Sequence, residues 1–213
     1  MGRGLVAVVG SRVDTRLFRP REGGAPALDA VMVGGLADVK NHATVLRAWP
    51  RVLRELPDAR LAIAGEGAGR PRLEALVASL GLGRHVDLLG RVPHARVAGL
   101  LASARCLLQP SWSEGHPRAV LEGMASGLPV VCTDIPAHRE IVTPETGRLV
   151  PPHDARLWAG AVVATLSDPA RAAEMGARGR AVAVARHDLG TGLDRYAGFI
   201  RAVAERHQRT GAP

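Results

Sequence analysis

Short apolar runs alternate with longer amphipathic segments along most of this chain, and this alternation limits the possible folds more than any other feature. Each run is nearly continuous in apolar residues, as is typical of strands that helices cover on both faces. A strand, a helix and a strand that repeat in this order predict an α/β fold with a single Rossmann-like, doubly wound parallel sheet of about six strands.

The predicted strands are Ala30–Val33, Leu61–Ala64, Val86–Leu89, Cys106–Leu108, Val130–Cys132 and Arg148–Val150. The helices expected between them are His42–Glu55, Pro71–Leu80, Ala95–Ser103, Arg118–Ser126 and Pro136–Ile141. In sheets of this kind ligands bind at the carboxyl ends of the strands. The loops that follow the first four strands are therefore predicted to border a binding site.

After Pro151 and Pro152 the pattern changes to helices alone, at Asp154–Leu166, Pro169–Ala185 and Leu189–Glu205. We therefore expect three parts. Residues 1–24 form a linker that is too short for a domain, and residues 25–152 form the Rossmann-like core. Residues 153–213 form C-terminal helices that pack on the same domain.

The net charge of +8 and the pI of about 11.1 invite a nucleic-acid interpretation. However, the basic residues are 27 arginines and one lysine spread along the chain, and six aromatic side chains are too few for a stacking platform. We expect no nucleic-acid partner. Arg47, Arg51 and Arg54 share one face of a predicted helix, where a solvated surface is favoured over contact with an anionic membrane or an acidic partner.

No apolar run approaches the roughly 20 residues of a membrane span. The block Leu5–Val9 is too short for the apolar core of a secretory signal, so the sequence predicts a cytoplasmic protein. Cys106 and Cys132 lie in apolar segments without CxxC spacing, which indicates buried reduced thiols.

Two carboxylates, Glu114 and Glu122, stand eight residues apart across a glycine-proline corner. Glu114 falls in a predicted loop, and Glu122 falls on the helix that follows. A carboxylate accepts hydrogen bonds only, so each can bind a pair of vicinal hydroxyls such as those of a ribose or another sugar.

The corner between these carboxylates, Gly115-His116-Pro117, is predicted to form an anion site. Pro117 suits the first turn of the helix, because its missing N–H needs no partner there. The backbone N–H groups of Gly115, His116 and Arg118 are expected to point outward at the positive end of the helix dipole, where they can bind phosphate. Phosphate between two hydroxyl-bearing rings describes a nucleotide sugar.

The same segment resembles the hallmark of glycosyltransferase family 4, whose members are retaining transferases with two Rossmann domains, the GT-B architecture. The resemblance rests on Glu114 and Glu122 at this spacing, followed by Ala125, Gly127 and Pro129-Val130-Val131. Further matches are Val33-Gly34-Gly35-Leu36 with Lys40, Leu61 to Gly67 with Arg70, Val86 to Val92, and the hinge-like Ser11-Arg12-Val13-Asp14 with Phe18 and Pro20. The resemblance covers nearly the whole chain, in order, and implies the C-terminal, donor-binding half of the architecture.

The resemblance also implies roles for individual residues. Lys40 would bind the donor diphosphate, and Glu122 would bind the ribose hydroxyls. Glu114, with the backbone of Gly115 to Pro117, would bind the transferred sugar. Lys40 and Glu114 are therefore the candidate catalytic residues.

The remaining donor-binding candidates are Gly34, Gly35, Gly65, Gly67, Arg70, Arg91 and Val92. The glycine turns would let the backbone approach the donor, and the stretch Arg91–Val92 would pass along the edge of the base. Gly35 departs from the family pattern, which has an arginine there to clamp the diphosphate together with the lysine. Either Arg70 or Arg91 replaces this charge, or phosphate binding is impaired.

The chain has no Asp-x-Asp pair, and its histidines lack metal-ligand spacing, so we expect no metal and no cofactor. The expected donor is a UDP- or GDP-linked sugar, and the acceptor is unknown.

Because the acceptor domain of the family is N-terminal, two interpretations stay open. The chain is either the donor-binding domain of a glycosyltransferase, incomplete on its own, or a catalytically incomplete nucleotide-sugar-binding module. The module would need an N-terminal-domain partner chain or would form a homodimer. The spacing of Glu114 and Glu122 argues against a nucleotide-sugar epimerase or phosphorylase.

Overall fold

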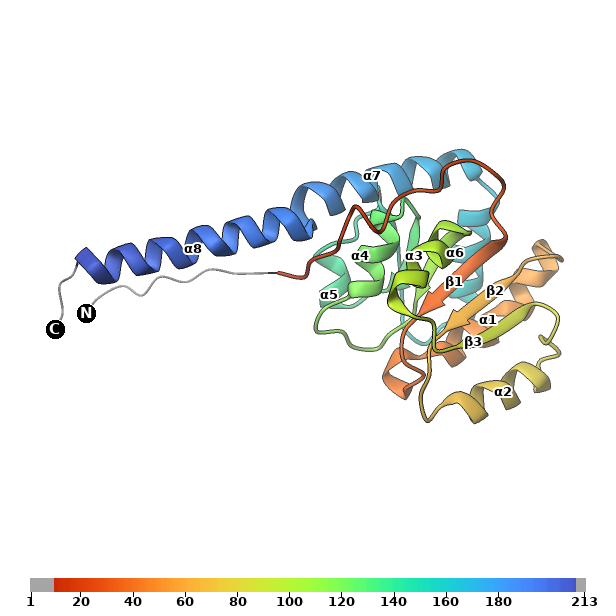
Figure 1. Ribbon diagram of the computed structural model, residues 1–213. Coiled ribbons are helices and arrows are strands. Elements are labelled where there is room, and N and C mark those ends of the chain that lie inside the picture. The colour runs from red at the N-terminus through yellow and green to blue at the C-terminus, as the bar shows by residue number, and fades with distance from the viewer. Residues whose placement is uncertain (1–9, 210–213) are drawn as a thin grey trace.

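The computed structural model describes residues 10–209, which fold around one six-stranded sheet (Figure 1). All neighbouring strands are parallel, in the order β3-β2-β1-β4-β5-β6. The strands are β1 Leu28–Val33, β2 Leu61–Ala64, β3 Val86–Gly90, β4 Ala104–Gln109, β5 Val130–Thr133 and β6 Gly147–Val150. The predicted single parallel sheet of six strands is confirmed.

Helices join successive strands and lie on both faces of the sheet (Figure 1). They are α1 His42–Glu55, α2 Arg70–Ser79, α3 His94–Ala102, α4 Arg118–Ala125, α5 Pro136–Arg139, α6 Ala155–Leu166, α7 Pro169–His187 and α8 Leu189–Arg209, with a short 3-10 helix η1 at Asp38–Lys40. Ala30 and Met32 of β1 face one core and Val31 faces the other, because successive side chains of a strand alternate between faces.

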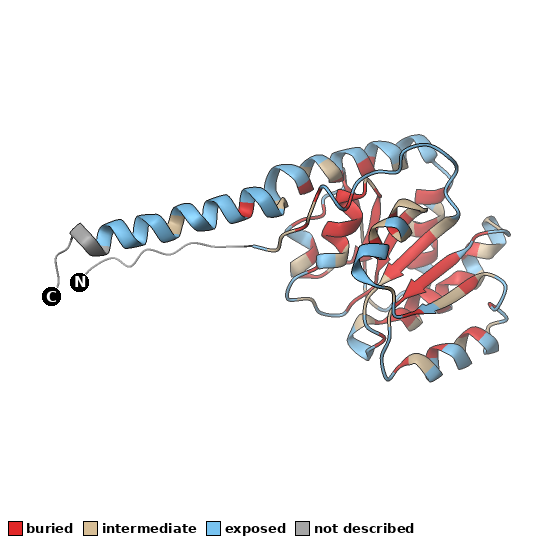
Figure 2. Ribbon diagram, viewed as in Figure 1, coloured by how far each residue is buried: buried red, intermediate tan, exposed pale blue. Residues whose placement is uncertain are grey.

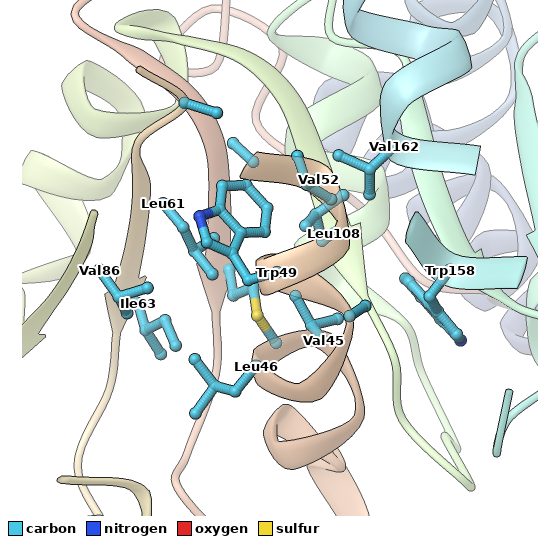
Figure 3. Packing of buried hydrophobic residues seen from close by; sticks show 14 of the residues in the cluster. Val45, Leu46, Trp49, Val52, Leu61, Ile63, Val86, Leu108, Trp158 and Val162 are labelled. Carbon is cyan, nitrogen blue, oxygen red and sulfur yellow. The ribbon is translucent and has the colours of Figure 1, made fainter. Parts of the chain in front are cut away.

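The first core lies between the sheet and the helices α1, α2 and α6. Its two largest side chains are those of Trp49 and Trp158, and both are fully buried. Figure 3 shows Trp49 among residues of α1 and the strands, with Trp158 of α6 to one side. Truncation of a buried aromatic side chain of this size costs about 3–5 kcal/mol of stability. The second core lies under α3, α4 and α7. Both cysteines are buried and unpaired, as predicted.

The observed elements follow the predicted ones closely. The largest difference is in α8, which continues to Arg209 rather than ending at Glu205, and among the strands the largest difference is in β4. This strand begins at Ala104, two residues before the predicted Cys106, because Ala104 pairs with Leu28 of β1 and the ladder continues past the apolar run. The short helix α5 ends at Arg139 rather than Ile141.

The helices α6 and α7 pack on the body, and α8 extends away from it (Figure 1). Most of α8 is exposed (Figure 2), including Leu193 and Ile200. The junction of α7 and α8 is held by Val13, which donates its N–H to the His187 carbonyl and accepts from the Leu189 N–H. The expected assignment of α8 to the same packed domain stays a prediction.

Candidate functional site

The loops at the carboxyl ends of β1, β2 and β3 border a pocket of about 360 Å³. Its lining includes Gly34, Gly65, Glu66, Arg91, Val92 and His94. The parallel sheet therefore brings four of the donor-binding candidates together at one edge, as its topology requires.

Two glycines allow the loops after β1 and β2 to interlock. A Cβ atom at Gly65 would overlap the carbonyl oxygen of Gly34, and one at Gly67 would lie 2.9 Å from the backbone of Leu36. The Leu36 N–H donates to the Glu66 carbonyl at 2.8 Å across the same contact. Positions 65 and 67 accept no larger residue without displacing this backbone.

Gly35 differs from these two glycines, because a side chain fits there. A Cβ atom at this position would make an ordinary 3.6 Å contact with the Glu66 carbonyl oxygen. Within residues 10–209 the backbone N–H of Gly35 makes no hydrogen bond, so it is available to a ligand.

The two arginines considered as replacements for the family arginine have different surroundings. Arg70 donates to Glu74 at 2.8 Å, to Glu66 at 3.1 Å and to the Leu88 carbonyl at 3.3 Å, so two carboxylates already neutralise its charge. Arg91 lines the pocket and has no hydrogen bond or ion pair in the described part of the chain. Arg91 is the better placed cation.

Asn41 fixes the end of η1, where Lys40 lies. It adopts a left-handed conformation with φ of 52°, which asparagine tolerates better than most residues. Its side-chain amide donates to the carbonyls of Pro110 and Pro152 at 3.1 and 2.9 Å. Asn41 thereby ties the loop after β1 to the loops after β4 and β6.

Lys40 and Glu114 form an ion pair between the β1 and β4 loops. Lys40 Nζ lies 2.7 Å from Oε1 and 2.9 Å from Oε2 of Glu114. The lysine side chain is 26% exposed and the glutamate side chain 7%. A compact ammonium in this position can bind a phosphate oxygen while it keeps its carboxylate partner.

Two buried polar residues, Gln109 and Ser111, also donate hydrogen bonds to the Glu114 carboxylate. Gln109 donates to Oε1 of Glu114 at 2.8 Å, and the Ser111 hydroxyl donates to it at 2.7 Å. Burial opposes ionisation of Glu114, but the hydrogen bonds from Lys40, Ser111 and Gln109 outweigh burial and hold the pKa of this carboxyl below its usual value. Oε1 therefore has three protein donors, whereas Oε2 has Lys40 alone.

Glu122 lies on α4 beside the pocket, and its carboxylate is 9% exposed. His94 Nε2 lies 3.0 Å from its Oε1, and Arg118 Nη2 lies 3.9 Å from the same oxygen. No hydrogen bond joins Glu122 to Glu114 in residues 10–209. The two carboxylates are thus anchored separately, Glu114 through both oxygens and Glu122 through Oε1.

The glycine-proline corner departs in part from the expected geometry. Pro117 is buried and occupies the N-cap position of α4 rather than its first turn, because the helix begins at Arg118. The N–H of Arg118 donates to the His116 carbonyl at 2.8 Å and is not free for an anion. The His116 ring pairs with the hydroxyl of Ser11 at 2.9 Å, whereas the N–H groups of Gly115 and His116 have no partner in the described residues.

Sequence reasoning missed four residues of the site. They are Asn41, His94, Gln109 and Ser111. The sequence offered two signals for them: Asn41 directly follows Lys40, and Gln109 ends an apolar strand. Their partners, however, lie on loops far away in the sequence.

Within residues 10–209 no helix is both long and apolar enough to cross a membrane. No group of three or more His, Cys, Asp or Glu side chains in this range is arranged to hold a metal ion.

The sequence profile of the family described as Glycosyl transferases group 1 matches residues 23–182. Among curated relatives, D-inositol 3-phosphate glycosyltransferase of Kineococcus radiotolerans is 32% identical over 240 residues, which cover 97% of this chain and 54% of that protein. MMP alpha-(1->4)-mannosyltransferase of Mycolicibacterium hassiacum is 33% identical over 83% of this chain and 43% of its own length. The chain therefore spans about half the length of the curated relatives it matches.

Solved structures match the fold. Sucrose-phosphate synthase from Thermosynechococcus elongatus superposes with a TM-score of 0.83 at 26% identity, over 96% of this chain and 54% of that chain. The pneumococcal O-GlcNAc transferase, solved in complex with UDP and GlcNAc, gives a TM-score of 0.80 at 20% identity, over 92% of this chain and 39% of that one. The expected likeness to one half of a GT-B fold is confirmed.

Proposed function

The chain belongs to the group 1 glycosyl transferases, and we propose that it is the donor-binding domain of a retaining transferase of family 4. It binds a UDP- or GDP-linked sugar, and that sugar passes to an acceptor with retention of its anomeric configuration. An N-terminal domain, in the same protein or in a partner chain, binds the acceptor.

The observation that carries this proposal is the ion pair of Lys40 and Glu114 at 2.7 Å. It sets a cation and a carboxylate side by side at the carboxyl edge of a parallel sheet, next to the pocket after β1, β2 and β3. The ammonium of Lys40 can bind a diphosphate, and the carboxylate of Glu114 can accept a hydrogen bond from a sugar hydroxyl.

In the proposed mechanism the chain stabilises charge on the leaving diphosphate. Lys40 and the unused N–H of Gly35 bind its oxygens as negative charge develops, which is the usual electrostatic contribution to such a reaction. Arg91 adds a second cation at the pocket wall. The reaction requires no side-chain nucleophile, because the acceptor attacks on the face from which the diphosphate leaves. We propose that it also requires no metal, since Lys40, Arg91 and the N–H of Gly35 supply positive charge to the diphosphate.

The two carboxylates bind hydroxyl groups at the two ends of the donor. Glu114, held through Oε1 by Gln109 and Ser111, offers Oε2 to the transferred sugar. Glu122 offers its own Oε2 to the ribose. Both oxygens belong to carboxylates whose position the protein already determines, which lowers the entropic cost of binding.

The second candidate function is a nucleotide-sugar-binding module without turnover of its own. The glycine at position 35 favours it, because that position lacks the arginine that would share the diphosphate charge with Lys40. Release of free sugar from UDP- and GDP-linked donors, assayed with the N-terminal domain present, separates the two functions. Turnover supports the transferase, and binding without turnover supports the module.

Calorimetric titration with UDP, GDP and ADP tests the shared donor site. We expect at least one diphosphate to bind and Glu122→Ala to weaken it about tenfold or more, since a hydrogen bond to a charged group contributes about 1.5–3 kcal/mol. Glu55→Ala, an exposed glutamate at the far end of α1, serves as the matched control and should bind as the wild type does. If none of the three diphosphates binds, the donor-site assignment is wrong.

A further inference from the structure

Glu122 depends on a single close donor, and that donor comes from another loop. Its carboxylate is 9% exposed, and His94 Nε2 approaches Oε1 to 3.0 Å. Arg118 Nη2, at 3.9 Å, lies beyond hydrogen-bond distance. A carboxylate this far from solvent is costly without a donor, so His94 is the group that holds it in the described structure.

The imidazole of His94 is itself held in place. The residue begins α3, directly after the Arg91–Pro93 segment that lines the pocket. Its ring packs edge-on against Phe18, with centroids 5.3 Å apart and an interplanar angle of 61°. Phe18 is almost fully buried, while the His94 side chain stays 55% exposed. The ring is therefore fixed between Phe18 and Glu122 and still open to the pocket.

The direction of the hydrogen bond follows from the chemistry of the two groups. An ionised carboxylate can only accept, so His94 Nε2 carries the hydrogen and donates it to Glu122 Oε1. Oε2 makes no hydrogen bond within residues 10–209. His94 thus determines which oxygen of Glu122 remains for a ligand.

Glu114 has more hydrogen-bond donors than Glu122. Three donors on two loops and a strand hold its Oε1, so the loss of one leaves two. Glu122 has one, so a single substitution releases its carboxylate.

We propose that His94 is a positioning residue for Glu122 and that it sets how strongly the donor site distinguishes ribose from 2′,3′-dideoxyribose. The inference rests on the proposed function, because it takes the ribose of a nucleotide as the ligand of Glu122. His94 links the base-side loop to this carboxylate, so the diol meets an oxygen whose orientation is fixed before binding.

The test compares one nucleotide diphosphate with its 2′,3′-dideoxy analogue. Whichever of UDP, GDP and ADP binds tightest is titrated by calorimetry into the wild type, His94→Phe and His94→Gln. Phenylalanine keeps a ring against Phe18 but removes the donor, whereas glutamine keeps an N–H donor and removes the ring. His85→Phe, just before β3 at the opposite edge of the sheet, is the matched control.

We expect the wild type and His85→Phe to bind the ribose form about tenfold to a hundredfold more tightly than the dideoxy form. His94→Phe should lose most of this ratio while its affinity for the dideoxy form stays unchanged. His94→Gln should recover a large part of the ratio. A residue with a purely structural role would shift both affinities equally and would leave the ratio intact.

A double-mutant cycle completes the test. Because His94 acts through Glu122, His94→Phe should change nothing further in a Glu122→Ala background. If His94→Phe and His94→Gln keep the wild-type ratio while Glu122→Ala loses it, the inference on His94 is wrong and the proposed donor site stands. If the wild type binds none of the diphosphates, the proposed function falls, and the inference falls with it.

Discussion

Lys40 donates to both oxygens of the Glu114 carboxylate, at 2.7 and 2.9 Å, although 74 positions separate the two residues in the sequence. Their loops follow β1 and β4, which are neighbours in the sheet at the point where the strand order reverses. Ligands of doubly wound sheets bind at this switch point. The pair therefore joins the two halves of the sheet where a ligand is expected.

Lys40→Met should weaken diphosphate binding and also destabilise the fold. Without the ammonium, the 7% exposed carboxylate of Glu114 keeps only Gln109 and Ser111 as donors. Loss of one partner of such a pair costs about 1–3 kcal/mol, and urea unfolding at neutral pH measures it. Lys40→Met combined with Glu114→Gln should recover part of this loss, and equal stability of the two variants would argue against the ion pair.

The ion pair of Lys40 and Glu114 also predicts that the stability of the fold depends on pH in the acidic range. The folded state holds the pKa of Glu114 below its usual value of 4.5. Stability from this group is therefore present above that value and is lost as pH falls through the lowered pKa. In urea unfolding at a series of pH values, Lys40→Met should lose less stability in this range than the wild type does.

His42 predicts a second pH dependence at higher pH. Burial, together with the charge of Lys40, lowers the pKa of this histidine to about 4. The unfolded chain takes up the proton near 6.5 and the folded chain does not, so stability falls as pH decreases from 6.5 towards 4. His42→Gln should remove up to about 3 kcal/mol of this change.

The stability of each protein is compared with its own stability at pH 8, where His42 of the wild type is neutral in both the folded and the unfolded state. Burial also lowers the pKa of His138, so some dependence should remain in His42→Gln. An unchanged slope between pH 6.5 and 4 would contradict the assignment of the protonation to His42.

Gly35→Arg should strengthen diphosphate binding. A side chain fits at this position, since a Cβ atom would lie 3.6 Å from the Glu66 carbonyl oxygen. The new guanidinium would share the phosphate charge with Lys40, and a charge-assisted hydrogen bond contributes about 1.5–3 kcal/mol, or roughly tenfold or more in affinity. Calorimetry with the same diphosphates measures the gain, and Gly35→Ala controls for the loss of backbone freedom.

Leu193→Ser and Ile200→Ser on α8 should leave the stability of the domain almost unchanged. These side chains are 59% and 48% exposed, and exposed substitutions usually change stability by less than about 0.5 kcal/mol. Leu107→Ala in β4, where the side chain is fully buried, should cost about 2–5 kcal/mol. A large loss in the α8 variants, measured by urea unfolding, would mean that α8 packs on the domain.

The local hydrophobic pattern was sufficient to predict the helices and strands of this fold. Helix α1 begins at His42 and ends at Glu55 as predicted, because its apolar residues recur at helical spacing and form one buried face. The start of β4 was harder to predict, since Ala104 extends the strand by pairing with Leu28 rather than by being part of the apolar run.

The positions of the candidate residues followed from the sequence, but the partners of those residues did not. Glu114 lies in a loop and Glu122 on a helix, as predicted. That Lys40 pairs with Glu114 depends on the distance between two loops across the sheet. That Arg70 rather than Arg91 is neutralised depends on where Glu66 and Glu74 point.

The sequence by itself determined which segments form strands and that these strands run parallel, and hence that the motif loops gather at one edge of the sheet. Hydrophobic periodicity is local, so it carries this information directly. Only the tertiary structure decided that His94 holds Glu122 and that Lys40 meets Glu114. Hydrogen bonds require approach to about 3 Å and the right direction, and no spacing along the chain specifies either for residues on different loops.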